Sequence, residues 1–282
     1  MKKSSLRRRL VAALIIAGFA GSASADPIRT FTGSTGNTLV RNDDGSTGLV
    51  NIGFNLNFFG SAYSQLYVNN NGNLTFDARL GTYTPFNLLS TSTPIIAPFF
   101  GDVDTRGLGS NEVTYGSGLL GGFDAFAANY LRVGVFSRLS IYNTFQVVLI
   151  NRSDIAPGDF DFEFNYALIN WEAGQASGSN AQGLSGAAAR AGYSNGLATS
   201  YEIAGSAVNG AFLDTSLVTG LIYSRLGVPF DGAAMDGRYT FNVRSGTVIT
   251  PVLTPVPEPS TYGIFAVLGL IGIVARRRLR KN

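Results

Sequence analysis

Two groups of carboxylates in this sequence are spaced closely enough to do chemistry, and the first follows the apolar run 94–100. Asp102 and Asp104 come directly after that run, and Arg106 follows them. Side chains two residues apart on a strand point to the same side, so these carboxylates could share a cation or pair with Arg106. A calcium ion takes about six oxygen ligands, and Glu112 or loop carbonyls could supply others. The alternative is a turn whose aspartates accept backbone N–H bonds.

The second group is Asp159, Asp161 and Glu163. Residues i and i+2 of a strand lie roughly 6.5–7 Å apart, within the range of about 5–9 Å between the two carboxyl groups of a glycoside hydrolase. Alternating charged residues are, however, typical of the solvent face of a strand. We therefore expect a solvent face and assign no catalytic residue. The one tryptophan, Trp171, shares a face with Ile169, so we expect it in the core rather than stacked on a sugar.

The residue types that are missing exclude several kinds of catalysis. Between the basic clusters at its two ends, the chain has no Lys, His or Cys. This excludes a thiolate nucleophile, a Schiff-base lysine, a Ser-His-Asp triad and a zinc site of the usual Cys/His type. No disulfide can form, so the core alone must hold the fold together. We expect a protein that is not an enzyme.

The formal charge of +3 conceals an acidic body. Five of the 21 basic residues lie in the first nine positions and five in the last seven. The stretch between them holds eleven arginines and all 18 acidic residues, a net charge of −7. Phosphate binding needs a basic surface, so nucleic acid is not an expected partner.

Short apolar runs with a period of two predict an all-β fold. In 50–58 every second residue is apolar, and in 160–166 aromatic residues alternate with Asp, Glu and Asn. The Asn-Gly step at 71–72 predicts a hairpin with a two-residue turn. The run 94–100 predicts a buried strand, whereas 187–191 could form a helical turn. The 35 glycines of the chain indicate many turns, so we expect one β-sandwich-like domain over 26–245.

The N-terminal 25 residues have the features of a signal peptide. A basic start precedes the apolar run 10–20, and Ala23 and Ala25 occupy the small-residue positions of a cleavage site. As a helix that run reaches only about 17 Å, against about 30 Å for a bilayer core, so a permanent anchor is disfavoured. We expect residues 1–25 to direct export.

The C-terminal residues contain a second apolar segment with different surroundings. Residues 246–259 hold four of the ten prolines and are predicted to be an extended linker. A short transmembrane helix is predicted at 260–275, followed by a cytoplasmic tail at 276–282 because basic residues stay on that side. A buried core helix is the alternative, but a cluster of five charges follows the segment at once: Arg276, Arg277, Arg278, Arg280 and Lys281.

Several motifs follow one another along the body, among them FNLNFFGSAYSQLYVNNNGNLTFD (54–77), PIIAPFFGDVDTRG (94–107), FEFNYALINWEAG (162–174) and GRYTFNV (237–243). In this order they resemble segments of the extracellular nidogen-like (NIDO) domain. One departure is Phe100, where the family often has Trp. The resemblance spans roughly 45–245 and implies an extracellular adhesion domain without a known catalytic role.

Pro257, Glu258 and Pro259 form a Pro-Glu-Pro motif, and the apolar segment and the basic cluster follow it. In this order the three parts closely resemble the PEP-CTERM sorting signal of Gram-negative bacteria. The resemblance implies transient anchoring in the inner membrane, cleavage near the motif by an exosortase, and delivery to the cell surface or an extracellular matrix.

These observations favour a surface or matrix protein that contributes to adhesion or biofilm, alongside exopolysaccharide or other surface proteins. The first alternative is an exopolysaccharide-binding module, with calcium as a possible cofactor held by Asp102 and Asp104. The second alternative is a secreted hydrolase that uses carboxylates only, and the missing Lys, His and Cys weigh against it.

Overall fold

The computed structural model describes residues 26–137, 140–217, 219–222 and 237–249. The expected signal peptide with Ala23 and Ala25, the sorting motif, the apolar segment 260–275 and the basic tail lie outside these residues. Within the described ranges, no helix has the length and apolar character needed to cross a bilayer.

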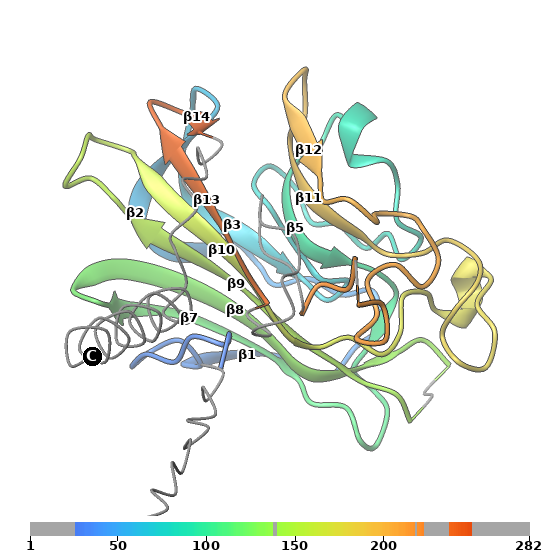
Figure 1. Ribbon diagram of the computed structural model, residues 1–282. Helices are drawn as coiled ribbons and strands as arrows, with labels where there is room; N and C mark the ends of the chain where they lie inside the picture. The colour runs from blue at the N-terminus through green and yellow to red at the C-terminus, as the bar shows by residue number, and fades with distance from the viewer. Residues whose placement is uncertain (1–25, 138–139, 218, 223–236, 250–282) are drawn as a thin grey trace, which may run out of the picture.

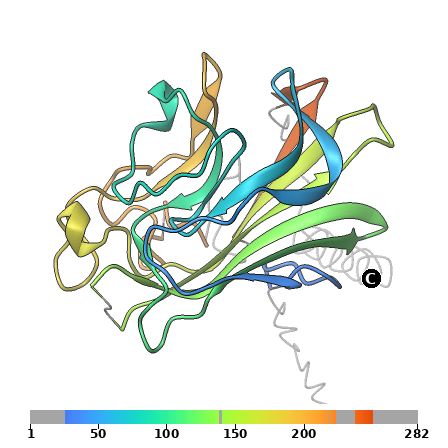
Figure 2. The ribbon, with the colours of Figure 1, turned by 180° about the vertical axis from the view of Figure 1, so that it is seen from behind.

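Two antiparallel sheets face each other across the core (Figures 1 and 2), as expected from the sequence. One sheet has eight strands in the order β1-β7-β8-β9-β10-β13-β14, with β6 paired to β8. Its strands are β1 (Asn37–Leu39), β6 (Val103–Asp104), β7 (Val113–Leu120), β8 (Phe123–Val135), β9 (Asn143–Asn151), β10 (Phe160–Leu168), β13 (Arg238–Arg244) and β14 (Thr247–Ile249).

The other sheet has six strands in the order β12-β11-β5-β4-β3-β2. They are β2 (Val50–Phe58), β3 (Ser61–Asn69), β4 (Asn73–Thr75), β5 (Pro94–Phe100), β11 (Arg190–Asn195) and β12 (Ser200–Glu202). Two short 3₁₀ helices, η1 (Leu88–Ser90) and η2 (Gln175–Ser177), lie in the connections.

The alternating runs form the strands that their pattern predicts. In β2, Ile52, Leu56 and Phe58 are buried and the residues between them are not. Residues Ile95 to Phe100 of β5 are all buried, as a continuous apolar run requires. Two details differ from the prediction: β11 begins within the stretch that could have been a helical turn, and β14 occupies the start of the expected linker.

The β3–β4 hairpin is present, but its turn is longer than predicted. Asn69 pairs with Asn73, which leaves three residues in the turn. Of these, Gly72 has a positive φ of 76°, and a Cβ at this position would collide with the carbonyl oxygen of Phe99. A three-residue hairpin turn with a left-handed third residue is a common alternative to the two-residue form. The approach of β5 to this turn therefore requires the glycine.

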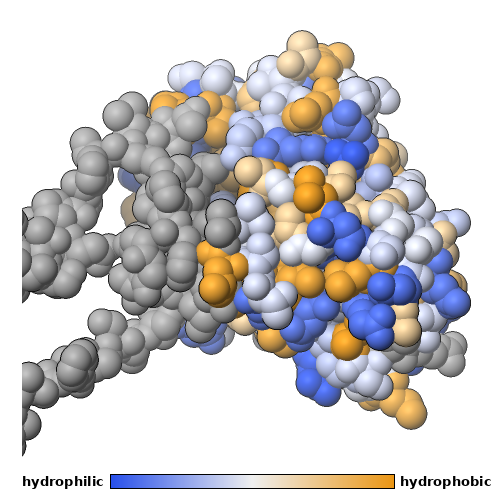
Figure 3. All heavy atoms as spheres, turned by 45° about the vertical axis from the view of Figure 1, so that its right-hand side comes forward, coloured by the Kyte–Doolittle hydropathy of each residue, from blue (hydrophilic) through white to orange (hydrophobic). Residues whose placement is uncertain are grey.

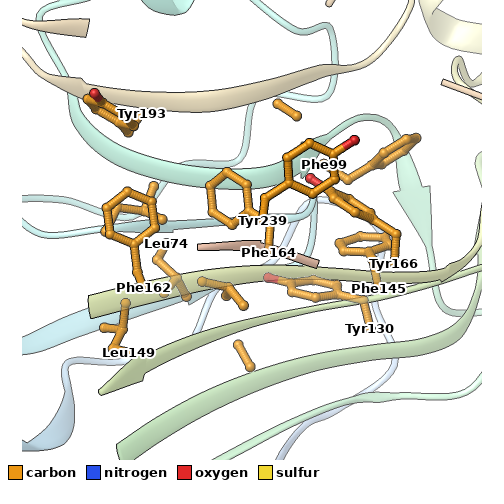
Figure 4. Close-up of a cluster of buried hydrophobic side chains, with 14 of the residues drawn as sticks. Leu74, Phe99, Tyr130, Phe145, Leu149, Phe162, Phe164, Tyr166, Tyr193 and Tyr239 are labelled. Carbon is orange, nitrogen blue, oxygen red and sulfur yellow. The ribbon is translucent and has the colours of Figure 1, made fainter. Parts of the chain in front are cut away.

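Aromatic side chains fill the space between the sheets (Figure 4). Phe162 of β10 stacks on Phe241 of β13 with ring centroids 4.5 Å apart, and Tyr193 of β11 meets Phe162 edge-on at 5.7 Å. Tyr130 of β8 stacks on Phe145 of β9 at 4.6 Å. On the face drawn in Figure 3, hydrophobic residues form small groups among hydrophilic ones. Most of the large apolar side chains thus pack between the two sheets.

Two buried tyrosines also join the sheets by hydrogen bonds. The hydroxyl of Tyr166 on β10 donates to the carbonyl oxygen of Pro98 on β5 at 2.6 Å. The hydroxyl of Tyr130 on β8 donates to the carbonyl oxygen of Asn69 on β3 at 2.7 Å. Burial raises the pKa of both phenols, so both remain protonated donors.

We expect Tyr166→Phe to lower the free energy of unfolding by about 1–3 kcal/mol, because it leaves the carbonyl of Pro98 buried without this donor. Urea denaturation of the purified protein, followed by tryptophan fluorescence, measures this loss. Tyr83→Phe is the matched control, since Tyr83 is 39% exposed. Equal stability of the two variants would contradict a structural role for the hydroxyl.

Candidate functional site

Asp104 pairs with Arg106 and also accepts a backbone N–H bond, which are two of the three possibilities that the sequence left open. Asp104 Oδ1 accepts hydrogen bonds from the backbone N–H and from Nε of Arg106, both at 2.9 Å. Asp104 Oδ2 accepts from Arg106 Nη2, also at 2.9 Å. Glu112, the other candidate ligand, accepts from the backbone N–H of Arg41 at 3.3 Å. Both oxygens of Asp104 are therefore occupied by a guanidinium.

Asp102 instead lies beside two aspartates of the β1–β2 connection. One carboxylate oxygen from each of Asp43, Asp44 and Asp102 lies within 4.8 Å of the other two. We call these three residues the acidic cluster. The sequence analysis missed Asp43 and Asp44, although their Asp-Asp-Gly sequence is a turn signal that places two carboxylates at one loop tip.

The side chain of Asp102 is buried without a partner among the described residues. It is only 1% exposed, and its Oδ2 atom has no hydrogen-bond partner. Glu172, which is equally buried, differs because its carboxylate accepts the backbone N–H groups of Gly210 and Phe212. A buried carboxylate oxygen that lacks such donors is costly, so the burial of Asp102 needs an explanation that Glu172 does not.

Burial and like charges together favour the protonated forms of Asp102 and Asp43. Burial, followed by the charges of Asp43, Asp44 and Asp104, raises the pKa of Asp102 to about 7. Burial and the charges of Asp104 and Asp44 raise the pKa of Asp43 to about 6. Arg106 acts in the opposite direction on both groups. One guanidinium therefore does not offset the negative charge gathered here.

Buried asparagines of the β3–β4 turn hold the loops of the cluster together. Asn70 Nδ2 donates to the carbonyl oxygens of Asp43 and Val103, and Asn71 Nδ2 donates to Asp44 Oδ1 at 2.9 Å. Asn71 Oδ1 accepts the backbone N–H of Val103 at 3.0 Å. The turn thus binds the β1–β2 connection on one side and the start of β6 on the other.

The second carboxylate group is buried, so the prediction of a solvent face on β10 was wrong. Asp159, Asp161 and Glu163 are 2%, 7% and 4% exposed. Asp161 forms ion pairs with Arg152 at 2.9 Å and with Arg244 at 2.7 Å. Asp159 Oδ1 accepts the backbone N–H of Ser245 at 2.7 Å.

The N-terminal segment of the body covers the rest of this face of β10. Arg29 donates two hydrogen bonds to Glu163 at 2.9 and 2.8 Å, and its backbone exchanges hydrogen bonds with the side chain of Gln146 on β9. Because arginines bind Asp161 and Glu163, these carboxylates stabilise the fold as ion pairs. A glycoside hydrolase needs one of its carboxyl groups to protonate the substrate, and both of these are held by arginines.

Trp171 lies in the core, as predicted. It is fully buried, and its ring meets Phe99 edge-on with centroids 5.3 Å apart. Phe100, the position that departs from the resembled family, is also buried and meets Phe86 edge-on at 4.9 Å. Neither ring is available to stack on a sugar.

We expect the stability of the metal-free protein to fall as pH rises from about 4 to about 7. In this window the folded protein retains the proton of Asp102, whereas the unfolded chain, with a pKa near 3.8, has released it. Asp102→Asn removes this contribution and should raise the free energy of unfolding at pH 8 by about 1–3 kcal/mol. Urea denaturation in EDTA at pH 5 and pH 8 measures the difference.

Asp124→Asn is the control for this prediction, because Asp124 is an exposed residue of β8. The control should keep the pH dependence of the native protein. An Asp102→Asn variant with an unchanged pH dependence would show that Asp102 is ionised without cost in the folded state.

Comparison with known proteins places the described fold in a family. A model described as NIDO related matches residues 19–224. α-Tectorin of Mus musculus is 31% identical over 183 residues, which cover 56% of this chain and 8% of the relative. Nidogen of Drosophila melanogaster is 30% identical over 237 residues, which cover 73% of this chain and 16% of the relative. No solved structure matches.

The chain thus spans only a small part of the curated relatives that it matches. A second family model, the PEP-CTERM protein-sorting motif, matches residues 255–278. This motif implies export, sorting to the cell surface and processing by an exosortase. By the extent of the first match, the chain belongs to the NIDO-related family, and it carries a PEP-CTERM sorting motif after its β-sandwich domain.

Proposed function

We propose that this protein is a structural or adhesion protein of the surface or extracellular matrix of a Gram-negative bacterium, where it associates with exopolysaccharide in a biofilm. The observation that carries the proposal is the order of the parts. A NIDO-related domain precedes a PEP-CTERM motif, so the domain that would make contacts is joined to a signal for surface sorting.

In this proposal the tail acts only during delivery. The apolar segment 260–275 halts export in the inner membrane, and the basic cluster keeps the last residues in the cytoplasm. An exosortase then cleaves near Pro257, Glu258 and Pro259, which releases the acidic β domain from its anchor. The signal peptide at 1–25 starts this route and is removed first.

The domain acts by binding rather than by catalysis. The ion pairs of Asp161 and Glu163 with arginines support this part of the proposal, because a general acid needs a carboxyl group that is free to exchange a proton with substrate. Exopolysaccharide and other surface proteins are the expected contacts. A glycan array with the exported protein tests the first of these, and the absence of any bound glycan would leave proteins as the contacts.

Replacing Pro257, Glu258 and Pro259 together by alanine should leave the full-length chain in the inner membrane. The native protein should appear shortened at the surface or in the matrix. Fractionation of the host cells with intact-mass measurement distinguishes these products. Leu253→Ala with Thr254→Ala is the matched control, since it alters the same stretch without the motif. A triple variant that is shortened and delivered like the native protein would contradict the sorting proposal.

Cells that lack the protein should retain less matrix and attach less firmly than the parent cells. The full chain should restore attachment, whereas a chain that ends at residue 256 should be exported without the sorting step and should not restore it. Crystal-violet staining of attached cells measures the effect. Attachment that is equal in all strains would contradict the adhesion role while leaving the sorting proposal intact.

A further inference from the structure

The end of the sandwich where β5 meets the β3–β4 turn holds more negative charge than its neighbours neutralise. Asp43, Asp44, Asp102 and Asp104 gather there, and Arg106 forms ion pairs with Asp43 and Asp104. The nearby guanidinium of Arg41 donates instead to the carbonyl oxygens of Thr105, Gly107 and Ser110. Among the described residues, no guanidinium therefore compensates the charge of Asp102 by an ion pair.

We propose that the acidic cluster of Asp43, Asp44 and Asp102 binds one calcium ion. This site differs from the pair expected from the sequence, because Asp104 is occupied by Arg106 and two residues of the β1–β2 connection take its place. The inference concerns the folded domain alone and does not depend on sorting or adhesion.

Two unpartnered oxygen atoms point to a bound ligand independently of the charge. Asp102 Oδ2 and Asp43 Oδ1 are both buried, and neither has a hydrogen-bond partner among the described residues. The carboxylate of Asp102 cannot turn to water, since the residue is only 1% exposed. A cation in contact with these oxygens would take the place of the missing donors and offset the desolvation penalty of the buried carboxylates.

The ligand types and their spacing suit calcium. Calcium binds carboxylate, carbonyl and water oxygens at about 2.3–2.6 Å, so two of its ligands lie at most about 5 Å apart. The three cluster oxygens fall within 4.8 Å of one another. The chain offers no His or Cys for a softer metal. Asp44 is exposed, so an ion can enter from solvent and keep water ligands that complete its coordination.

The fold fixes the cluster before an ion arrives. Asn71 Nδ2 holds Asp44 Oδ1, and Arg106 Nη2 holds Asp43 Oδ2 at 2.8 Å, which leaves the second oxygen of Asp43 for the ion. Gly174 also packs against Asp102, so closely that a Cβ at position 174 would collide with the carboxylate. A backbone glycine packed against a carboxylate restricts where that carboxylate can point.

Isothermal titration of the purified, EDTA-treated protein with CaCl₂ tests the proposal. We expect one site with a Kd of about 10⁻⁵ to 10⁻³ M, the range of extracellular calcium modules and weaker sensors. Calcium should also raise the melting temperature, because it binds the folded state. Asp102→Asn and Asp44→Asn should each weaken binding at least about tenfold, since each removes a charged ligand.

Asp44→Asn keeps the test decisive if Asp102→Asn disturbs folding, because Asp44 is exposed and tolerates replacement. Asp124→Asn, at an exposed position of β8, should bind calcium like the native protein. The proposal is overturned by an absence of heat and of any melting shift in the native protein. It is equally overturned if binding persists unchanged in both cluster variants, or if Asp124→Asn weakens it as much as they do.

Discussion

The buried turn between β3 and β4 holds the loops at this end of the molecule in place by hydrogen bonds. Its asparagine side chains satisfy the backbone groups of two loops that are distant in sequence, and its Asn69 carbonyl accepts the hydroxyl of Tyr130 from the other sheet. Unpaired backbone groups buried at this point would destabilise the fold, so these hydrogen bonds hold the two loops against the turn. The same hydrogen bonds set Asp43 and Asp44 beside Asp102. The geometry of the acidic cluster is therefore a consequence of how the hairpin is buried.

The two carboxylate groups show how burial alone does not decide the role of an acidic residue. On β10, Asp161 and Glu163 are buried with arginines, and their charge is compensated within the fold. At the end of β5, Asp102 is buried without such a partner among the described residues. An uncompensated buried charge lowers stability. The arginines compensate the charges of Asp161 and Glu163, whereas Asp102 needs a ligand or a proton to neutralise it. This difference separates a stabilising ion-pair network from a candidate site.

The sequence predicted the strands, which depend on residues close together in the chain. It missed the contacts that join residues far apart in the chain. The strands β2, β5 and β10 follow from the alternation and length of their apolar runs, because a strand has a period of two. The outer face of β10 did not follow, because Arg29 and Arg244, which cover it, come from opposite ends of the domain. The pairing of Asp104 with Arg106 is local and was foreseen as a possibility. The carboxylates that lie beside Asp102, Asp43 and Asp44, come from another loop, and no periodicity in the sequence connects them with it.

A crystal structure of the protein grown with calcium, with anomalous diffraction to locate the ion, tests the central claim most directly. The account predicts one ion bound by carboxylate oxygens of Asp43, Asp44 and Asp102 at about 2.3–2.6 Å, with Asp104 still paired to Arg106. Calcium found only at other surface carboxylates, with the carboxylate of Asp102 still without a ligand, would contradict it.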